Sequence, residues 1–186
     1  MYRANQENIK ALIPFLSTDA TRPVLAHVIA KGGFLWATDG YKMARIAIEG
    51  NVDGPKDLGE IVSTLTPTKY GKGLVLVPIE TDSQTPNVDT VWPKNKPTWS
   101  FEGVNDGKKR TCALSEIAAN LALRGVLIDW KQLAALPEGQ FTVSGTSTLS
   151  PVLFTGDGFE AVMMPLRSSE GLRKALEDVN KTALAV

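Results

Sequence analysis

The hydrophobic residues between positions 6 and 16 recur at helical spacing, which predicts a short amphipathic helix in this part of the chain. Pro14 falls inside the segment. It should end or kink the helix near Ile13, because proline supplies no backbone N–H and its ring clashes with the preceding turn. The buried side of this helix would be formed by Ile9, Leu12, Ile13 and Leu16.

Residues 22–48 change to the alternating spacing that is typical of β-strands. Gly32-Gly33 and Asp39-Gly40 are turn signals. They divide the segment into three predicted strands, of which the second covers 34–38 and the third 43–48. One face of the first strand would carry Val24, Ala26, Val28 and Ala30. The predicted order is therefore helix, strand, strand, strand.

Residues 113–167 repeat this order. A helical segment ends at Gly125, a common C-terminal stop for helices. A shorter helix should begin at Trp130, with Asp129 as its N-cap. Three strands then follow within 140–166, separated by turns that contain glycine and serine.

A short sequence echo accompanies the repeated order. The tripeptide Pro23-Val24-Leu25 recurs as Pro151-Val152-Leu153, which favours an internal duplication. We therefore predict an α+β fold with duplicated halves, each a helix plus an antiparallel sheet, near 1–50 and 110–167.

The sequence between these halves is different in kind. Residues of about 50–110 are rich in glycine and proline and read as an irregular connector, with one strand candidate at 73–80. We expect a single folded unit over 1–167. Residues 168–186 form a candidate tail helix, with Leu172, Ala175 and Val179 on one side.

Charge and composition limit the classes of function. Twenty Lys and Arg balance twenty Asp and Glu, so no net charge draws the chain to nucleic acid or membrane, and DNA binding would need local clusters or assembly. No stretch approaches the about 20 apolar residues of a spanning helix, and the first residues lack a signal-peptide pattern. The single Cys112 fits a reducing compartment. We expect a cytoplasmic protein without membrane partners.

The sequence offers little catalytic or metal-binding chemistry. His27 is its only histidine and lies within a strand pattern, where we expect a structural role. No Cys or His partner has zinc-site spacing, no nucleophile has a recognisable base, and no phosphate-binding glycine loop is present. We predict no enzyme activity, cofactor or metal. The alternative is an unrecognised enzyme that uses aspartate-bearing turns, at Asp39 or Asp157.

Three segments, taken in order, resemble one known family. They are TRPVLAHVIAKGGFLWATDGYKMARIAI at 21–48, PNVDTVWPKN at 86–95 and SPVLFTGDGFEAVMMPLR at 150–167. The bacterial DNA sliding clamp, the β subunit of DNA polymerase III, has similar segments: Ala-Thr-Asp-Gly-His-Arg-Leu-Ala, Phe-Pro-Asp-Tyr with a following Pro-Lys, and a Val-Met-Pro-Met-Arg-Leu ending. Tyr41 stands here where His is usual, and Met43 where Leu is usual.

The resemblance implies a shortened, divergent member with the DNA-clamp fold. Clamps of this family have three domains per subunit and close a ring from two subunits, whereas this chain has about half that length and continues past Arg167. The implied function is a DNA sliding clamp: a polymerase processivity factor, or a tether that binds partner proteins at DNA, acting as a homo-oligomer. The alternative is a clamp-fold adaptor that binds protein partners without encircling DNA.

The family binds DNA polymerase and other partners through short apolar peptides that enter a surface groove. The positions that match its walls are Thr38, Gly40, Tyr41, Met43, Pro78, Val162, Met164, Pro165, Leu166 and Arg167. Methionine suits such a groove because its flexible thioether adapts to varied ligands. The alternative is that Met163 and Met164 are core or strand-face residues and that Pro165 merely ends a strand.

A clamp also needs cations that contact the phosphates of double-stranded DNA without reading its sequence. Lys10 and Lys131 lie on the two candidate inner helices, and Arg22 matches a Thr-Arg pair of the family. The densest basic run is Lys108, Lys109 and Arg110. Solvated surface charge is the competing explanation for each of them. The tail could close the groove against Tyr41, Met43 and Met164.

Overall fold

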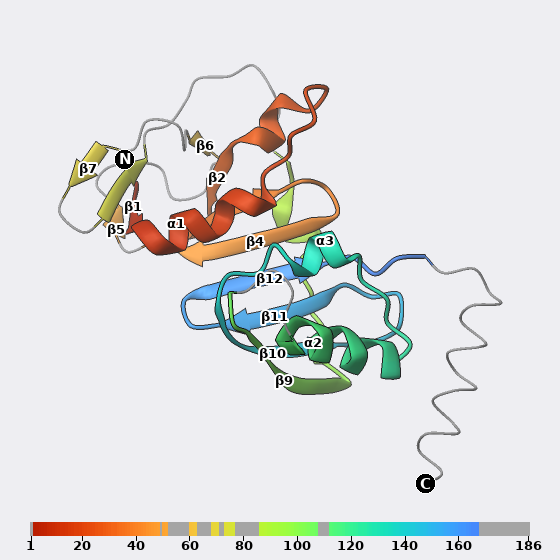
Figure 1. The fold of residues 1–186 in the computed structure, drawn as a ribbon. Coiled ribbons are helices and arrows are strands. Elements are labelled where there is room, and N and C mark those ends of the chain that lie inside the picture. Colours follow the sequence, from red (N-terminus) through yellow and green to blue (C-terminus); the bar gives the residue numbers. More distant parts are fainter. Residues whose placement is uncertain are drawn as a thin grey trace, which may run out of the picture. The chain divides into compact units, whose positions relative to one another are not determined.

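The computed structural model describes residues 2–48, 50–51, 60–62, 68–70, 73–76, 86–107 and 112–167. The chain divides into two compact units, residues 1–92 with 158–161 and residues 93–157 with 162–186. Each unit combines helices with antiparallel strands (Figure 1). The fold class is therefore α+β, as the sequence predicts.

The first unit contains a strand, a helix and two 3₁₀ turns, followed by a three-stranded meander. In chain order these elements are β1 (Tyr2–Asn5), α1 (Gln6–Leu12), η1 (Ile13–Phe15), η2 (Pro23–Ala26), β2 (Val28–Lys31), β3 (Phe34–Thr38) and β4 (Lys42–Ala47). Helix α1 packs on β4 (Figure 1). The predicted order of helix and three strands is confirmed, and β1 is an additional strand in front of the helix.

Proline ends the first helix where the sequence places the break. Helix α1 stops at Leu12 and continues as the 3₁₀ turn η1, with Pro14 near its start. The tighter turn changes the periodicity, so Ile13 is 52% exposed and its predicted burial is wrong. Phe15 takes the buried position instead and packs on Phe159, with ring centroids 5.8 Å apart.

The meander has the predicted turns but a shorter first strand. Gly32 and Gly33 have φ of 60° and 80°, conformations that glycine adopts without steric cost and that a two-residue hairpin turn requires. Residues 23–26 form η2 rather than a strand, because Pro23 fixes a helical φ at its start. The predicted strand face that includes Val24 and Ala26 is therefore wrong.

The tripeptide echo does not mark equivalent structures. Pro23-Val24-Leu25 lies in the 3₁₀ turn η2, whereas Val152 and Leu153 lie in a strand that begins just after Pro151. What does recur is the element order, with a strand and a helical segment ahead of three strands in each unit.

Short strands come from the middle of the chain: β5 (Gly50–Asn51), β6 (Glu60–Val62), β7 (Thr68–Tyr70) and β8 (Gly73–Leu76). Strand β1 lies between β5 and β8, β7 pairs with β8, and β6 pairs with β2. The predicted strand at 73–80 is confirmed over Gly73–Leu76, and its remainder lies outside the described residues. The predicted tail helix at 168–186 also lies outside them.

The second unit contains the same element types. Its elements are β9 (Trp99–Asn105), α2 (Cys112–Leu123), α3 (Trp130–Leu133), β10 (Gly139–Gly145), β11 (Val152–Gly156) and the end of β12 (Phe159–Met163), a strand whose first residues belong to the first unit. Helix α2 packs on β9 (Figure 1). Strand β9, which the sequence analysis did not predict, pairs with β10 along its whole length.

Both predicted helix ends of this unit are confirmed. Gly125 has φ of 70°, its N–H donates to the carbonyl of Ala122, and the Val126 N–H donates to the carbonyl of Leu121. These two bonds satisfy carbonyls that the end of α2 leaves unpaired. The Asp129 carboxylate caps α3 by accepting from the Lys131 N–H at 2.7 Å.

Candidate functional site

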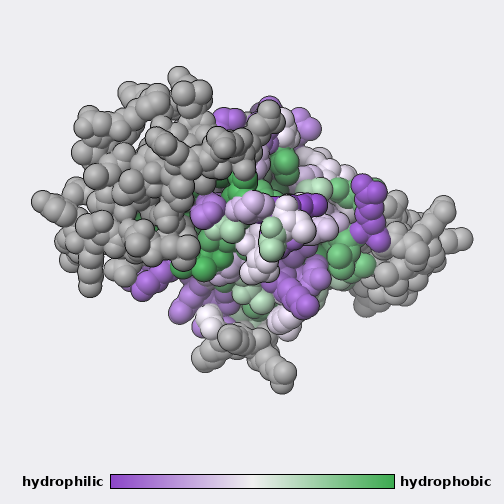
Figure 2. Space-filling view, turned by 90° about the horizontal axis from the view of Figure 1, so that it is seen from above, coloured by the Kyte–Doolittle hydropathy of each residue, from purple (hydrophilic) through white to green (hydrophobic). Residues whose placement is uncertain are grey.

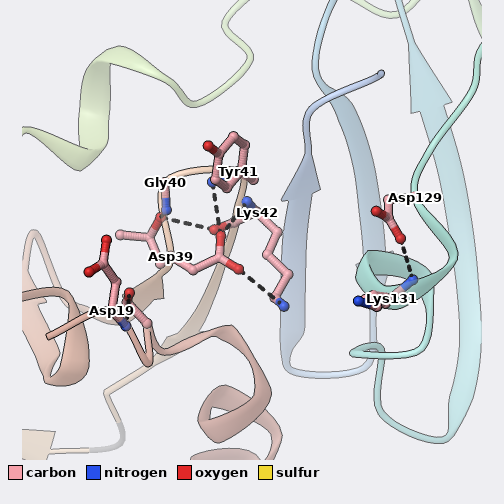
Figure 3. A network of polar contacts seen from close by, with 9 residues as sticks. Asp19, Asp39, Gly40, Tyr41, Lys42, Asp129 and Lys131 are labelled. Carbon is pink, nitrogen blue, oxygen red and sulfur yellow. Dashed lines mark hydrogen bonds and ion pairs between the residues drawn. The ribbon is translucent and has the colours of Figure 1, made fainter. Parts of the chain in front are cut away.

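The turn between β3 and β4 is held by the hydrogen bonds of two side chains (Figure 3). The Thr38 hydroxyl donates to the carbonyl of Lys42 at 2.9 Å and accepts from the Gly40 N–H at 3.0 Å. The Asp39 carboxylate accepts from the N–H groups of Tyr41 and Lys42, both at 2.9 Å. It also forms an ion pair with Lys42 Nζ at 3.2 Å. These bonds fix the turn that presents Tyr41, whose side chain is 65% exposed.

Arg22 lies against this turn. A Cβ placed on Gly40, which has φ of 94°, would lie 3.2 Å from Arg22 Nη1, so the absence of a side chain on Gly40 lets the guanidinium approach. Arg22 Nε is 4.0 Å from the Asp19 carboxylate. The sequence analysis assigned Arg22 to DNA and not to this turn, and no local pattern signals the contact.

Asp19 organises the segment that leads to Arg22. Its carboxylate accepts from the hydroxyl and the N–H of Thr21, at 2.7 and 2.9 Å. These hydrogen bonds, the hydroxyl bond above all, hold the pKa of the Asp19 carboxyl below its usual value, with a further contribution from the charge of Arg22. The turn at Asp19–Thr21 is thus held by an aspartate carboxylate, as is the turn at Asp39.

Met43 occupies a different environment from Tyr41. It is 4% exposed and packs in a core cluster with Ile29, Trp36 and Val88. Met43 is therefore a core residue in this structure, although the resemblance placed it in the groove. Val88 comes from the connector, in which Val91 is 45% exposed.

In the second unit, the end of β12 passes from core to surface. Val162 is buried, Met164 and Pro165 are half-buried, and Leu166 is 47% exposed, followed by an exposed Arg167. The Leu166 N–H donates to the carbonyl of Leu127 at 2.7 Å, which fixes this strand end. Val162 is thus a core residue, while Leu166 presents an apolar surface. Pro78 lies outside the described residues.

For the predicted DNA-binding cations, the structure shows where the described ones lie and whether they are exposed. Lys10 is exposed in the last turn of α1, and Lys131 is exposed in α3. Lys108, Lys109 and Arg110 lie outside the described residues. Both helices carry their predicted cation at the surface, and DNA contact by these residues stays a prediction.

Strand β9 borders a cleft that the sequence analysis missed. Among the described strands, β9 has β10 as its only neighbour, and the cleft of about 280 Å³ lies beside it and α2. Its lining residues are Glu102, Gly103, Val104, Glu116, Ile117, Asn120 and Gln140. The sequence signal that could have found β9 is the apolar–polar alternation of Trp-Ser-Phe-Glu at 99–102. In the structure, residues 99 and 101 are half-buried and 100 and 102 are exposed.

The described residues contain neither a candidate metal site nor a helix that could span a membrane. No group of three or more His, Cys, Asp or Glu residues there could hold a metal ion, and none of its helices is long and apolar enough to cross a membrane. The face seen in Figure 2 mixes hydrophilic and hydrophobic residues, and its green areas are small and bordered by purple ones.

The antiparallel sheets with packed helices in both units define the DNA-clamp fold. Among solved structures, the chain is similar to DNA polymerase III subunit beta from Borrelia burgdorferi, with a TM-score of 0.57 and 11% identity over 90% of this chain and 64% of that one. It is similar to pol III beta from Caulobacter crescentus, with a TM-score of 0.56 and 17% identity over 90% and 65%.

A third similar structure is the Helicobacter pylori beta clamp bound to a DNA ligase peptide, with a TM-score of 0.53 and 13% identity over 89% of this chain and 65% of the clamp. The match thus covers slightly less than two thirds of each of these proteins. No protein-family model and no curated protein matches the sequence. The fold expected from the sequence resemblance is confirmed.

Proposed function

We propose that this protein is a DNA sliding clamp-like protein: a non-enzymatic processivity factor or tether that binds partner proteins at DNA. The observation that carries the proposal is the DNA-clamp fold, which is matched over 90% of the chain. The contacts of Asp39 support a structural role for this aspartate rather than a catalytic one. Its carboxylate accepts hydrogen bonds from two backbone N–H groups and forms an ion pair with Lys42. A replication role fits the cytoplasmic location expected from the sequence.

Partner binding would use exposed apolar side chains whose backbone is held by hydrogen bonds. Tyr41 stands on a rigid turn with Arg22 beside it, and Leu166 stands on a strand end held by a hydrogen bond to Leu127. A fixed surface costs a ligand little ordering entropy. We propose that an apolar peptide with an acidic residue contacts Tyr41 and Arg22 of the first unit. Leu166 and Arg167 offer a separate exposed surface on the second unit. The H. pylori clamp, to which this chain is similar, is bound to a DNA ligase peptide, which supports peptide binding as the form of partner recognition.

Assembly into a ring would use the edge of β9. An edge strand offers unpaired N–H and C=O groups to another chain, and among the described strands β9 pairs with β10 alone. Pairing of two β9 edges would bring Glu102 and Glu116 close to their own copies, which like charges disfavour. We therefore propose a head-to-tail contact, in which the β9 edge meets a different surface of the next copy, since heterologous contacts can generate larger rings.

DNA would be held weakly and without sequence preference. The described cations on helices, Lys10 and Lys131, are few, and the chain has no net charge. Binding through a few phosphate contacts falls steeply with salt. Retention by a closed ring does not depend on such contacts, so topology rather than affinity would keep the protein on DNA.

The test is retention on closed circular DNA. We expect a molar mass in solution of two or more chains, measured by light scattering, and retention on nicked circular DNA that is lost when the DNA is linearised. The double variant Glu102→Lys/Glu116→Lys should become monomeric and lose retention, and Glu138→Lys, an exposed glutamate that does not line the cleft, serves as its control.

Two outcomes would change the conclusion. A monomer that binds the DNA ligase peptide but is not retained on circular DNA favours the adaptor that does not encircle DNA. A monomer with neither property refutes both functions.

A further inference from the structure

Residues Pro86–Trp92, the strap, fold back on the first unit. Val88 is 2% exposed and packs with Ile29, Trp36 and Met43. Trp92 packs on the same cluster, with its ring edge-on to that of Trp36 and the centroids 5.2 Å apart. An apolar side chain of the connector thus covers Met43, which the sequence resemblance assigned to the partner groove.

Arg45 on β4 holds the end of the strap. Its guanidinium carbon lies 3.9 Å from the centroid of the Trp92 ring, 4.3 Å from that of Phe34 and 5.1 Å from that of Trp36. Arg45 Nε also donates to the Glu160 carboxylate, and the two side chains are only 19% and 28% exposed. A partly desolvated cation among three rings is a stronger contact than an exposed one.

Backbone contacts do not anchor the strap in the same way. The hydrogen bonds described for it are internal, from the Val88 N–H to the carbonyl of Pro86 and from the Thr90 hydroxyl to the carbonyl of Asn87. Among the described residues, the contacts that attach the strap to the sheet are those of the Val88 and Trp92 side chains. A segment attached by side-chain packing can open locally at a lower free-energy cost than a strand in the sheet.

We propose that the strap is a displaceable cover over Met43, that the Arg45–Trp92 contact sets how often it opens, and that an apolar partner peptide competes with Val88 for this surface. The competition rests on the proposed partner binding, because the peptide is the ligand of that function. Val88 packs as one apolar side chain against Met43, Ile29 and Trp36. An apolar side chain of the peptide would make the same kind of contact. The ligand would therefore bind by selecting the open state.

Strap opening is measured by thiol labelling. In a Cys112→Ser background, Val88→Cys places the only thiol on the buried side of the strap itself, and its rate of reaction with a thiol reagent reports opening. Arg45→Met keeps an unbranched apolar side chain and removes the cation, and it should raise the labelling rate about tenfold. Glu160→Gln keeps the cation over the Trp92 ring and should raise the rate much less.

A matched control separates local opening from unfolding. Leu35→Cys in the same background places the thiol in β3, fully buried and outside the strap cluster. Its labelling rate should stay unchanged by Arg45→Met. Equal rates for Val88→Cys with and without Arg45, or a rise of the same size at Leu35→Cys, would overturn the displaceable cover.

The link to binding is tested with the DNA ligase peptide seen on the H. pylori clamp, carrying a fluorescein label. Its affinity for the otherwise unchanged chain should rise several-fold on Arg45→Met, because the closed state lowers the apparent affinity by the open fraction. Binding of equal affinity in both proteins overturns the competition while the proposed function stands. If neither protein binds the peptide, peptide binding and its competition with the strap both fail, whatever the labelling shows.

Discussion

The turn that presents Tyr41 depends on the carboxylate of Asp39, and replacing it tests that dependence. Asp39→Ala removes two hydrogen bonds to backbone N–H groups, of which the one to Lys42 is half-buried and the one to Tyr41 is exposed. It also removes the ion pair with Lys42, in which the side chains are 12% and 23% exposed. Asp39→Asn keeps a carbonyl oxygen that can accept from the same N–H groups, and removes only the charge.

The magnitudes follow from these environments. A hydrogen bond to a charged group contributes about 1.5–3 kcal/mol when buried, and less when exposed. An ion pair near the surface contributes about 0–1 kcal/mol. We therefore expect Asp39→Ala to lower the free energy of unfolding by about 3 kcal/mol and Asp39→Asn by about 1 kcal/mol.

The assay is urea unfolding followed by tryptophan fluorescence, because Trp36 lies on β3, which leads into this turn. Peptide affinity of the two folded variants should follow the same order, since a loosened turn presents Tyr41 less well. A loss below about 0.5 kcal/mol for Asp39→Ala, or equal losses for Ala and Asn, would show that the carboxylate's hydrogen bonds do not hold the turn.

Three further predictions follow from described contacts. Gly145→Ala should destabilise the second unit by about 1–3 kcal/mol in the same unfolding assay, because the new Cβ would overlap the Trp99 ring; a loss below about 0.5 kcal/mol would contradict the clash. The carboxyl of Asp19 should titrate by NMR at a pH below its usual range, and Thr21→Ala should raise that pKa; since the folded-state pKa is lowered, the stability it contributes is present above the unfolded pKa and is lost as the pH falls through the folded one, and an unchanged midpoint in Thr21→Ala would remove the hydroxyl as the cause. If Lys10 and Lys131 contact phosphates, Lys10→Ala and Lys131→Ala should each reduce the slope of log K against log salt by about 1; a slope unchanged by both would leave them as solvated surface charges.

Local signals account for the elements that were predicted correctly. Pro14, the glycine pair at 32–33, Gly125 and Asp129 act through their own backbone and side chains within a few residues. Local chemistry of this kind does not depend on the rest of the fold. The same holds for the Thr38-Asp39-Gly40 turn, whose hydrogen bonds all lie between residues 38 and 42.

The errors arose where a partner distant in sequence decides the outcome. Strand β9 follows proline-rich sequence and gains its structure from pairing with β10, about forty residues later. Met43 has the same local pattern whether it lines a groove or a core, and it is buried in a cluster that includes Val88 of the connector. Neither partner can be read from the neighbouring residues.

The sequence by itself thus determined the α+β class, the helix ends, the turn that presents Tyr41 and, through three short segments, the likeness to clamps. Tertiary structure alone decided that Arg22 lies against Gly40, that Arg45 binds Trp92 and Glu160, and that β9 borders an acidic cleft. The physical reason is one of range. Backbone preferences and capping bonds act over a few residues, whereas packing and ion pairs join positions that only the folded chain brings together.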